Sequence, residues 1–388
     1  MKKRIAAMVL AGAMALSLAP AYGVTEVKAE AADMKIAMVT DSGDITDQSF
    51  NQTTYEACKE WSAENGSEFN YYKPESDSDE ARNASVDQAV ADGANVIVLP
   101  GYMFAATIVE QSEMYPDVKF IAPDVSAGDI CEKGVGEGYT YNPDDYEVTD
   151  YYNADNVYCC TYQEEVSGYM AGYAAVKLGY KHLGFLGGMS VPAVTRFGYG
   201  YAQGADEAAK ELGITGDVEL EYVCGGQFYG DADITAYMDT WYGSKGVEVV
   251  FACGGGIYTS AAEAAAKVDG KVIGVDSDQS GIIGEDITVT SAMKGLAPTV
   301  KTALDAIKDG SWESDYAGKI DNLGLVSENP EENYVQLPMD TTQWDDNFTV
   351  DDYKDLVKKL YNGEIEVSND ITAMPETEIT VNDYGSIK

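Results

Sequence analysis

Polar and glycine-rich segments follow the ends of several apolar, strand-like runs in this chain. The run that begins at Lys35 is followed by DSGDITDQSFNQ, and later runs end at acidic residues, glycines or a lysine. The carboxyl ends of the strands in an open parallel sheet meet at one edge, where ligands bind. We therefore expect one cleft lined by Asp41, Asp44, Asp47, Phe50, Asn51, Asp124, Arg196, Phe228, Asp231, Gly254, Gly255, Gly256, Asp276, Asp278, Gln279 and Lys294.

The side chains of this set favour a neutral, polyhydroxylated ligand that carries a flat ring. Carboxylates accept hydrogen bonds from ring N–H groups and hydroxyls, and aromatic side chains stack on a π-face. Taken singly, an acidic residue such as Asp47 at the start of a predicted helix is equally consistent with helix capping or plain solvation. The recurrence of the pattern at successive strand ends is what indicates a shared site.

Other kinds of chemistry find little support. The segment DSDQSGIIGED from Asp276 imitates a calcium loop, but its twelfth position is Ile287 where a bidentate glutamate is needed. The sequence has no G-x-S-x-G elbow and no phosphate-binding glycine motif in register. The only histidine, His182, has no nucleophile motif beside it, and the six cysteines show neither metal-ligand spacing nor a disulfide framework. We expect no catalytic residues, no metal and no cofactor.

Apolar runs alternate with amphipathic helical stretches along the chain, which predicts a parallel sheet covered by helices. A first set of such units runs from Lys35 to Asp124, and a polar, Tyr-rich segment, 125–156, then predicts a long loop or a short hairpin insertion. The pattern restarts at VYCCTY and continues into a helix predicted over 350–361. Two consecutive sets of similar size predict two doubly wound α/β lobes.

The charge balance excludes two classes of partner. The chain has 25 lysines and arginines against 66 aspartates and glutamates, a formal net charge of −41 at pH 7. Nucleic acids and anionic lipid surfaces are bound by clustered positive charge, so we expect neither. A length of 388 residues is ample for two domains.

Residues 1–31 have the pattern of a secretory signal peptide. Lys2, Lys3 and Arg4 precede an apolar run, and Ala29-Glu30-Ala31 offers a cleavage site. The apolar run is shorter than the ~20 residues of a membrane-spanning helix. The first cysteine is Cys58, so no lipobox cysteine follows the apolar run. We expect an exported protein, in the periplasm or at the cell surface, that is soluble outside the cytoplasmic membrane.

Several segments resemble one family in the same order along the chain. DSGDITDQSFNQTTYEAC resembles the D-x-G-x-x-D-x-S-F-N signature of the basic membrane protein family of solute-binding proteins, the purine nucleoside receptors of ABC importers. FACGGGIYTSAAEAA, IGVDSDQ and VTSAMK resemble its later motifs, and KDLVKKLYNGEIEV resembles its closing helix and strand. The resemblance covers about Lys35 to about Val367 and implies the type I periplasmic binding protein fold, two Rossmann-like lobes joined by a hinge.

This fold implies a division into discontinuous lobes. We expect the N-terminal lobe to contain residues 32–162 and about 289–315, and the C-terminal lobe to contain 163–288 and about 316–345. Residues 346–388 are expected to form a C-terminal helix and tail. The 125–156 segment departs from the family's pattern and could reshape the rim of the cleft.

The resemblance also implies roles for particular residues. In this family two phenylalanines enclose the purine, one from each lobe, and they correspond to Phe50 and Phe228. The residues that contact the base and ribose correspond to Asp41, Asn51, Asp124, Gly255, Asp276 and Lys294. The implied function is a monomeric binding protein that delivers inosine, guanosine or adenosine to the permease subunits of an ABC importer. Three alternatives stay open: the same fold binding a sugar or other small solute, a secreted nucleoside-processing enzyme, and a surface protein with no transport role.

Overall fold

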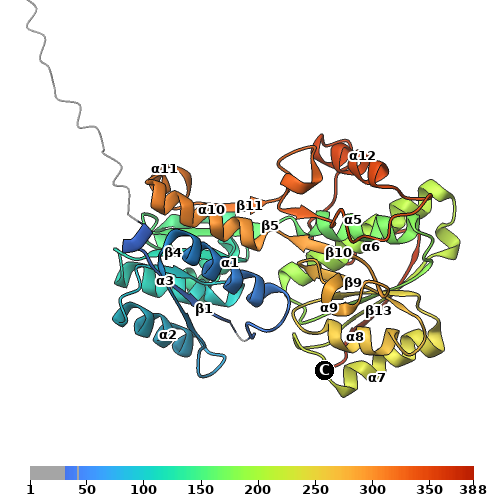
Figure 1. Ribbon diagram of the computed structural model, residues 1–388, viewed down its shortest axis with the longest axis horizontal. Helices are drawn as coiled ribbons and strands as arrows, with labels where there is room; N and C mark the ends of the chain where they lie inside the picture. The colour runs from blue at the N-terminus through green and yellow to red at the C-terminus, as the bar shows by residue number, and fades with distance from the viewer. Residues whose placement is uncertain (1–30, 42) are drawn as a thin grey trace, which may run out of the picture.

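The computed structural model describes residues 31–41 and 43–388, so the predicted signal peptide lies outside the described residues except for Ala31. The chain forms two α/β lobes that lie side by side (Figure 1). Each lobe has one mainly parallel sheet with helices packed against it, as the alternation of apolar runs predicts.

The first lobe contains a six-stranded parallel sheet with the order β11-β5-β4-β3-β1-β2. Its strands are β1 (Lys35–Val39), β2 (Glu68–Tyr72), β3 (Val96–Val98), β4 (Lys119–Pro123), β5 (Val157–Tyr162) and β11 (Ile320–Leu323). Its helices are α1 (Phe50–Asn65), α2 (Asp79–Ala91), α3 (Ala105–Met114), α4 (Ala127–Val135), α10 (Leu296–Asp309) and α11 (Trp312–Asp315). Strand centres such as Ile97 and Phe120 are fully buried between the helices.

The second lobe contains a seven-stranded sheet with the order β12-β10-β9-β8-β6-β7-β13, in which only β12 runs antiparallel to its neighbour. Its strands are β6 (His182–Gly187), β7 (Glu219–Cys224), β8 (Val249–Cys253), β9 (Lys271–Asp276), β10 (Thr288–Lys294), β12 (Val335–Gln336) and β13 (Thr380–Ser386). Its helices are α5 (Glu164–Lys177), α6 (Pro192–Leu212), α7 (Ala232–Thr240), α8 (Tyr258–Ala265), α9 (Ser280–Ile283) and α12 (Val350–Tyr361). A π-helical turn, η7 (Trp241–Lys245), follows α7 directly.

The pairing of two strands corrects the predicted lobe boundaries. β10 pairs with β9 in the second sheet, although the expected boundaries place most of it in the N-terminal lobe. β11 pairs with β5 in the first sheet, although the expected boundaries place it in the C-terminal lobe. The chain therefore passes between the lobes after β5, after β10 and after β11. The alternation of apolar runs predicts that a segment is a strand. It does not predict which of the two sheets the strand joins once the chain has crossed between the lobes.

Two further segments differ from the sequence-based expectation. The 125–156 segment begins with the helix α4, not with a loop or hairpin, and continues as short 3-10 turns at 136–138, 143–145 and 148–151. Ser126 and Asp129 form a capping box at the start of α4, a local signal that the apolar pattern does not register. Residues 363–367, expected to form a closing strand, form none. The last strand of the chain is β13, which lies at the edge of the second sheet beside β7.

Glycines allow α5 and α6 to approach each other closely. Gly168 and Gly172 on α5 face Gly200 and Gly204 on α6, and a Cβ at any of the four would overlap a backbone carbonyl oxygen of the opposite helix. Small residues spaced four apart on both helices are what such close packing requires. The contact fixes the amino-terminal ends of both helices, which lie beside the cleft described below.

We predict that Gly204→Ala lowers the free energy of unfolding by about 1–3 kcal/mol or more, because its methyl group has no space against the Tyr169 carbonyl. Helix propensity alone would favour alanine by about 1 kcal/mol, so a loss must come from the packing. Gly243→Ala is a matched control, since no atom lies near its added Cβ. Urea unfolding would measure both variants, and equal stability would show that the helices can separate without cost.

Candidate functional site

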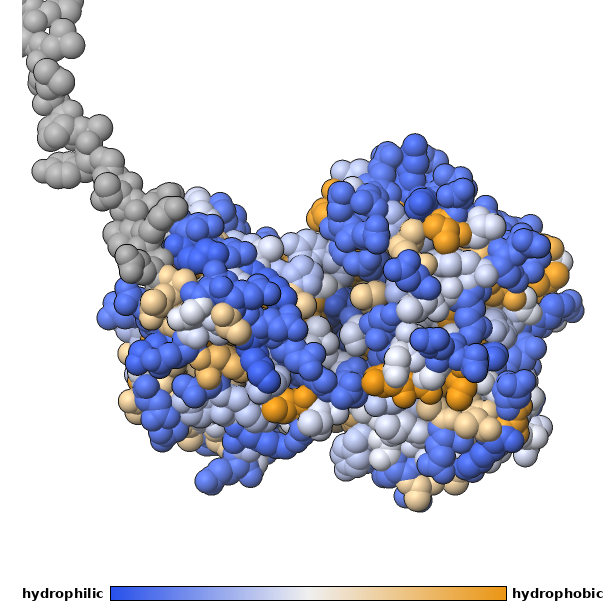
Figure 2. Space-filling model, in the orientation of Figure 1, coloured by the Kyte–Doolittle hydropathy of each residue, from blue (hydrophilic) through white to orange (hydrophobic). Residues whose placement is uncertain are grey.

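A cavity of about 720 Å³ lies between the lobes, at the carboxyl ends of the strands. The space-filling view shows the indentation between the lobes and the largely hydrophilic surface around it (Figure 2). The structure brings the residues predicted for the site together along this cavity: Asp41, Phe50, Asn51, Asp124, Phe228, Gly255, Asp276 and Lys294. Asp44, Asp47, Arg196, Gly254 and Gly256, from the wider predicted set, also line it.

The remaining members of the wider set lie off the cavity and have structural partners. Asp231 caps α7 by accepting from the backbone N–H groups of Asp233 and Ile234. Asp278 accepts from the Ser280 backbone N–H, and the Gln279 side-chain oxygen accepts from the backbone N–H of Val275. For these three residues the ordinary capping and turn roles of polar side chains account for the pattern in the sequence.

Lys294, at the end of β10, is buried in a network of charges. Its side chain is 3% exposed, and Nζ lies 2.7 Å from Asp124 Oδ2 and 3.1 Å from Glu164 Oε1. Arg196 Nε donates to the other oxygen of Glu164 over 2.6 Å. The position of Lys294 at a strand end does not by itself indicate this burial. Glu164 does not itself line the cavity, and sequence reasoning missed it because only the tertiary packing of α5 brings its carboxylate to Lys294 and Arg196.

The charges in this network compensate one another. Burial disfavours the Lys294 ammonium, but Asp124, Glu164 and Asp276 together raise its pKa above the usual value, so it stays charged. Burial likewise opposes the charge on Glu164, but the Arg196 and Lys294 cations lower its pKa. Burial dominates at Asp124 and raises the pKa of that carboxyl despite Lys294. Asp124 Oδ1 is buried without a hydrogen-bond partner among the described residues, which leaves it able to bind a ligand donor.

Aromatic rings surround the Lys294 ammonium. Nζ lies 5.2 Å from the ring centroids of Phe50 and Tyr162 and 5.6 Å from that of Phe197. These distances fall within the range of cation–π attraction. Phe50, the first residue of α1, is only partly buried and lines the cavity, so its ring is available to a ligand.

The first lobe contributes an acidic group around Asn51. Asn51 Nδ2 donates to Asp41 Oδ1 over 3.2 Å and to Asp47 Oδ2 over 3.3 Å, and the Gly43 backbone N–H donates to Asp41 over 2.7 Å. Burial raises the pKa of Asp41 to about 6. Asn51 Oδ1 is buried without a partner among the described residues. Because Asn51 Nδ2 already donates to two carboxylates, the atom that Asn51 leaves for a ligand is the acceptor Oδ1.

Asp276 joins the two lobes. Ser49 Oγ, just before α1, donates to Asp276 Oδ2 over 2.5 Å, and Gln279 Nε2 donates to the Gln48 carbonyl over 3.0 Å. Burial raises the pKa of Asp276 to about 6. Asp124 and Asp276 have φ of 63° and 64°, a left-handed conformation that is costly outside glycine and that clusters at functional sites.

Glycines in the second lobe make room for Phe228, which follows β7. A Cβ at Gly188, Gly254 or Gly255 would crowd the ring or the carbonyl group of Phe228. Gly254 and Gly255 also have φ of 145° and 50°, which favours glycine. Gly256 donates its N–H to the Phe228 carbonyl over 2.8 Å. Gly255 therefore supports the Phe228 loop as well as lining the cavity. Gly188 is another glycine that makes room for the Phe228 ring, and sequence reasoning missed it.

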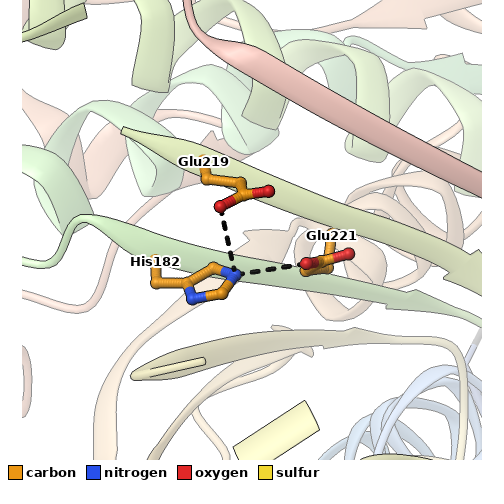
Figure 3. A group of neighbouring side chains, drawn as sticks. All are labelled: His182, Glu219 and Glu221. Atoms are coloured by element: carbon orange, nitrogen blue, oxygen red, sulfur yellow. Dashed lines mark hydrogen bonds and ion pairs between the residues drawn. The ribbon is translucent and has the colours of Figure 1, made fainter. Parts of the chain in front are cut away.

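Among the described residues, one group of side chains is close enough together to hold a metal ion: His182, Glu219 and Glu221 (Figure 3). It lies at the amino-terminal ends of β6 and β7, at the opposite edge of the sheet from the cavity. His182 Nε2 is 3.2 Å from Glu221 and 3.9 Å from Glu219. Lys245 Nζ already neutralises Glu221 at 2.9 Å, and Asn382 donates to Glu219 over 2.6 Å. These bonds favour a structural role for the group.

The architecture and cavity are those of a two-lobed solute-binding protein. The family described as "ABC transporter substrate-binding protein PnrA-like" matches residues 34–370, and the chain belongs to this family. Its fold is the type I periplasmic binding protein fold. A solved solute-binding protein of an ABC transporter system from Aeropyrum pernix K1 superposes with a TM-score of 0.65 at 20% identity, covering 87% of this chain and 94% of that one.

Two curated relatives extend the comparison. "ABC transporter nucleoside-binding protein BmpA" of Lactococcus lactis subsp. cremoris (strain MG1363) is 29% identical over 301 residues, which cover 72% of this chain and 76% of that protein. "Basic membrane protein B" of Borreliella afzelii (strain PKo) is 27% identical, with 79% of this chain and 83% of that protein covered. The family and fold are those of extracytoplasmic solute-binding proteins, which bind a small molecule for permease components, and not those of enzymes. Each helix within residues 31–41 and 43–388 is too short or too polar to span a bilayer.

Proposed function

We propose that this protein binds a purine nucleoside, namely inosine, guanosine or adenosine, between its lobes and presents it to an ABC permease. The observation that carries the proposal is the placement of Phe50 and Phe228, which line one cavity from opposite lobes. Two aromatic faces suit a flat heterocycle, and stacking of this kind is worth about 1–3 kcal/mol per base in nucleic-acid binders. The nucleoside-binding relative from Lactococcus lactis supports the same ligand class.

The polar residues divide between base and ribose. The Asp41 carboxylate and Asn51 Oδ1, beside Phe50, can accept from N–H groups at the edge of the base. Asp276 can accept from a ribose hydroxyl, and Lys294 can donate to ribose oxygens while it remains paired with Asp124. Contacts such as Ser49 to Asp276 already link the lobes, so a ligand that touches both lobes favours the closed arrangement. The protein forms no covalent bond with its ligand in this account.

Isothermal titration with inosine, guanosine, adenosine and ribose tests the proposal. We expect nucleosides to bind much more tightly than ribose, because ribose can reach the polar groups but offers no face to Phe50 and Phe228. Equal affinity for ribose and the nucleosides would contradict the proposal and favour a sugar-binding site in the same cleft.

The raised pKa values of Asp41 and Asp276 predict a pH dependence of binding. Ligand N–H and O–H donors bind the ionised carboxylates, and with pKa values of about 6 only about a tenth of each carboxylate is ionised at pH 5. Guanosine affinity should therefore fall about tenfold per carboxylate between pH 7.5 and pH 5. Asp41→Asn should flatten the profile, and a constant wild-type affinity across this range would show that neither carboxylate meets a ligand donor.

The position of the protein outside the cytoplasm follows from its family, and the manner of its attachment is part of the proposal. We propose that the protein is a monomer, and we expect it to lack a lipid anchor because no lipobox cysteine follows the apolar run of the predicted signal peptide. A relative from Pyrococcus abyssi (strain GE5 / Orsay), 26% identical, is described as a lipoprotein, so the two would differ in this respect. Incorporation of labelled fatty acid into the protein in its native host would contradict the expectation.

A further inference from the structure

Residues 368–388, here called the strap, run from the far end of the second lobe to the rim of the cleft (Figure 1). Almost all of the strap lies outside residues 34–370, the part of the chain that the family matches. Ser368 exchanges hydrogen bonds with Gln203 on α6, and Glu378 and Ile379 donate their backbone N–H groups to Asp206 on the same helix. The strap is thus attached before it reaches the sheet.

The second half of the strap forms β13, which pairs in parallel with β7. Asn382 bonds to Glu219, and the hydroxyl of Tyr384 accepts from Lys245 Nζ over 2.6 Å. The group in Figure 3 is therefore the point where the strap joins β6, β7 and the turn η7. These bonds fix β13 in register along β7, the strand that leads into the Phe228 loop.

The end of the strap contacts the Phe228 loop itself, residues 226–231. Ile387 donates its N–H to the Cys224 carbonyl over 2.8 Å, and a Cβ at Gly226 would crowd the main chain and Cβ of Lys388. Lys388 Nζ donates to Gln227 Oε1 over 3.1 Å and pairs with Asp231 Oδ2. Gln227 also donates to Asp231 and to the Tyr229 carbonyl, so both ends of the loop meet at Lys388.

We propose that the strap sets the position of the Phe228 loop and that Lys388 is a positioning residue for the ligand site. Gly226 to Gly230 line the cavity, whereas Lys388 does not. The strap therefore supports the Phe228 loop from the side away from the cavity. Almost all of the strap lies outside the part of the chain that the family matches. The choice of guanosine as probe rests on the proposed function, but the effect of the strap on the loop does not.

Hydrogen exchange of Lys388→Met tests the proposal without any ligand. We expect faster exchange in the peptide that spans residues 226–231, with β6 and β8 unchanged, and Lys388→Arg should restore the wild-type rate because it keeps the charge. Lys354→Met, an exposed lysine on α12 whose side chain is 48% exposed, is the matched control. Unchanged exchange in the loop would overturn the proposal, and so would faster exchange throughout β7, which would mean that the strap only covers the sheet edge.

Guanosine titration of the same variants provides a second readout. Ion pairs at partly exposed sites are weak, so we expect Lys388→Met to lower affinity about two- to fivefold, with Lys388→Arg near wild type. Equal affinity in all variants would overturn the role of the strap in binding. If guanosine does not bind the wild type, the proposed function fails, and the exchange rates still decide whether Lys388 positions the loop.

Discussion

Replacing Lys294 with methionine is expected to lower the free energy of unfolding by about 3–5 kcal/mol, the usual cost of breaking a buried ion pair by removing one partner. Methionine fills much of the same volume, so the loss comes from charge and not from a cavity. Asp124 and Glu164 would be left buried with only Arg196 to compensate them. Chemical denaturation of the wild type and the variant measures the difference.

Two controls identify the origin of that loss. Lys354→Met, on the exposed face of α12, should cost little, and the double variant Lys294→Met with Asp124→Asn should recover part of the stability because one unpaired charge is gone. Acid should also reduce the deficit. Without the cation the folded-state pKa values of both carboxyls rise, the folded state binds more protons, and stability relative to wild type recovers as pH falls. A deficit below about 1 kcal/mol at neutral pH would show that Lys294 is exposed.

The same variant should lose guanosine affinity by about 10–150-fold, since hydrogen bonds to charged groups are worth about 1.5–3 kcal/mol. Measuring affinity well below the unfolding transition separates this loss from the loss of stability. A variant that is unstable but binds guanosine as tightly as wild type would restrict Lys294 to a structural role.

Phe50→Ala is expected to separate a ligand platform from a core residue. A fully buried phenylalanine costs about 3–5 kcal/mol of stability when truncated, but Phe50 is only partly buried and borders the cavity. We therefore expect a much smaller loss of stability and a 5–150-fold loss of guanosine affinity, from about 1–3 kcal/mol of stacking.

Phe69→Ala is the matched control for Phe50→Ala. Phe69 on β2 is also partly buried, and it packs against Tyr55 with a centroid distance of 5.4 Å and lies outside the cavity. It should lose stability and keep its affinity. If Phe50→Ala melts early and still shows the full thermal shift with guanosine, Phe50 is a core residue and the proposed sandwich is wrong.

The sequence predicts which residues line the cavity better than it predicts how the strands connect between the two lobes. Residues at or just after the ends of strands, such as Asp41, Asp124 and Asp276, reach the cavity because parallel strands have their carboxyl ends at one edge of the sheet. Glu164 opens a helix, and its place beside Lys294 and Arg196 depends on the packing of α5 against β10 and α6. Both partners are more than thirty positions away in the sequence, so no local pattern around Glu164 predicts them.

The strap is the clearest part of the fold that the sequence did not predict. The segment TVNDYGS of β13 is polar and contains a glycine, which argues against a strand on apolar alternation alone. Its partners are the edge of β7 and the side chains of Glu219 and Lys245, which are distant in sequence. Such a strand forms because the edge of a sheet has unpaired backbone groups to which it can hydrogen-bond. The local composition of the segment does not indicate that such an edge is nearby.

A crystal structure of the protein grown with guanosine would test the central claim most directly. The account predicts closed lobes, the base between the rings of Phe50 and Phe228, and the ribose hydroxyls at Asp276 and Lys294. Guanosine bound elsewhere, or a cavity that remains empty at saturating guanosine, would contradict it.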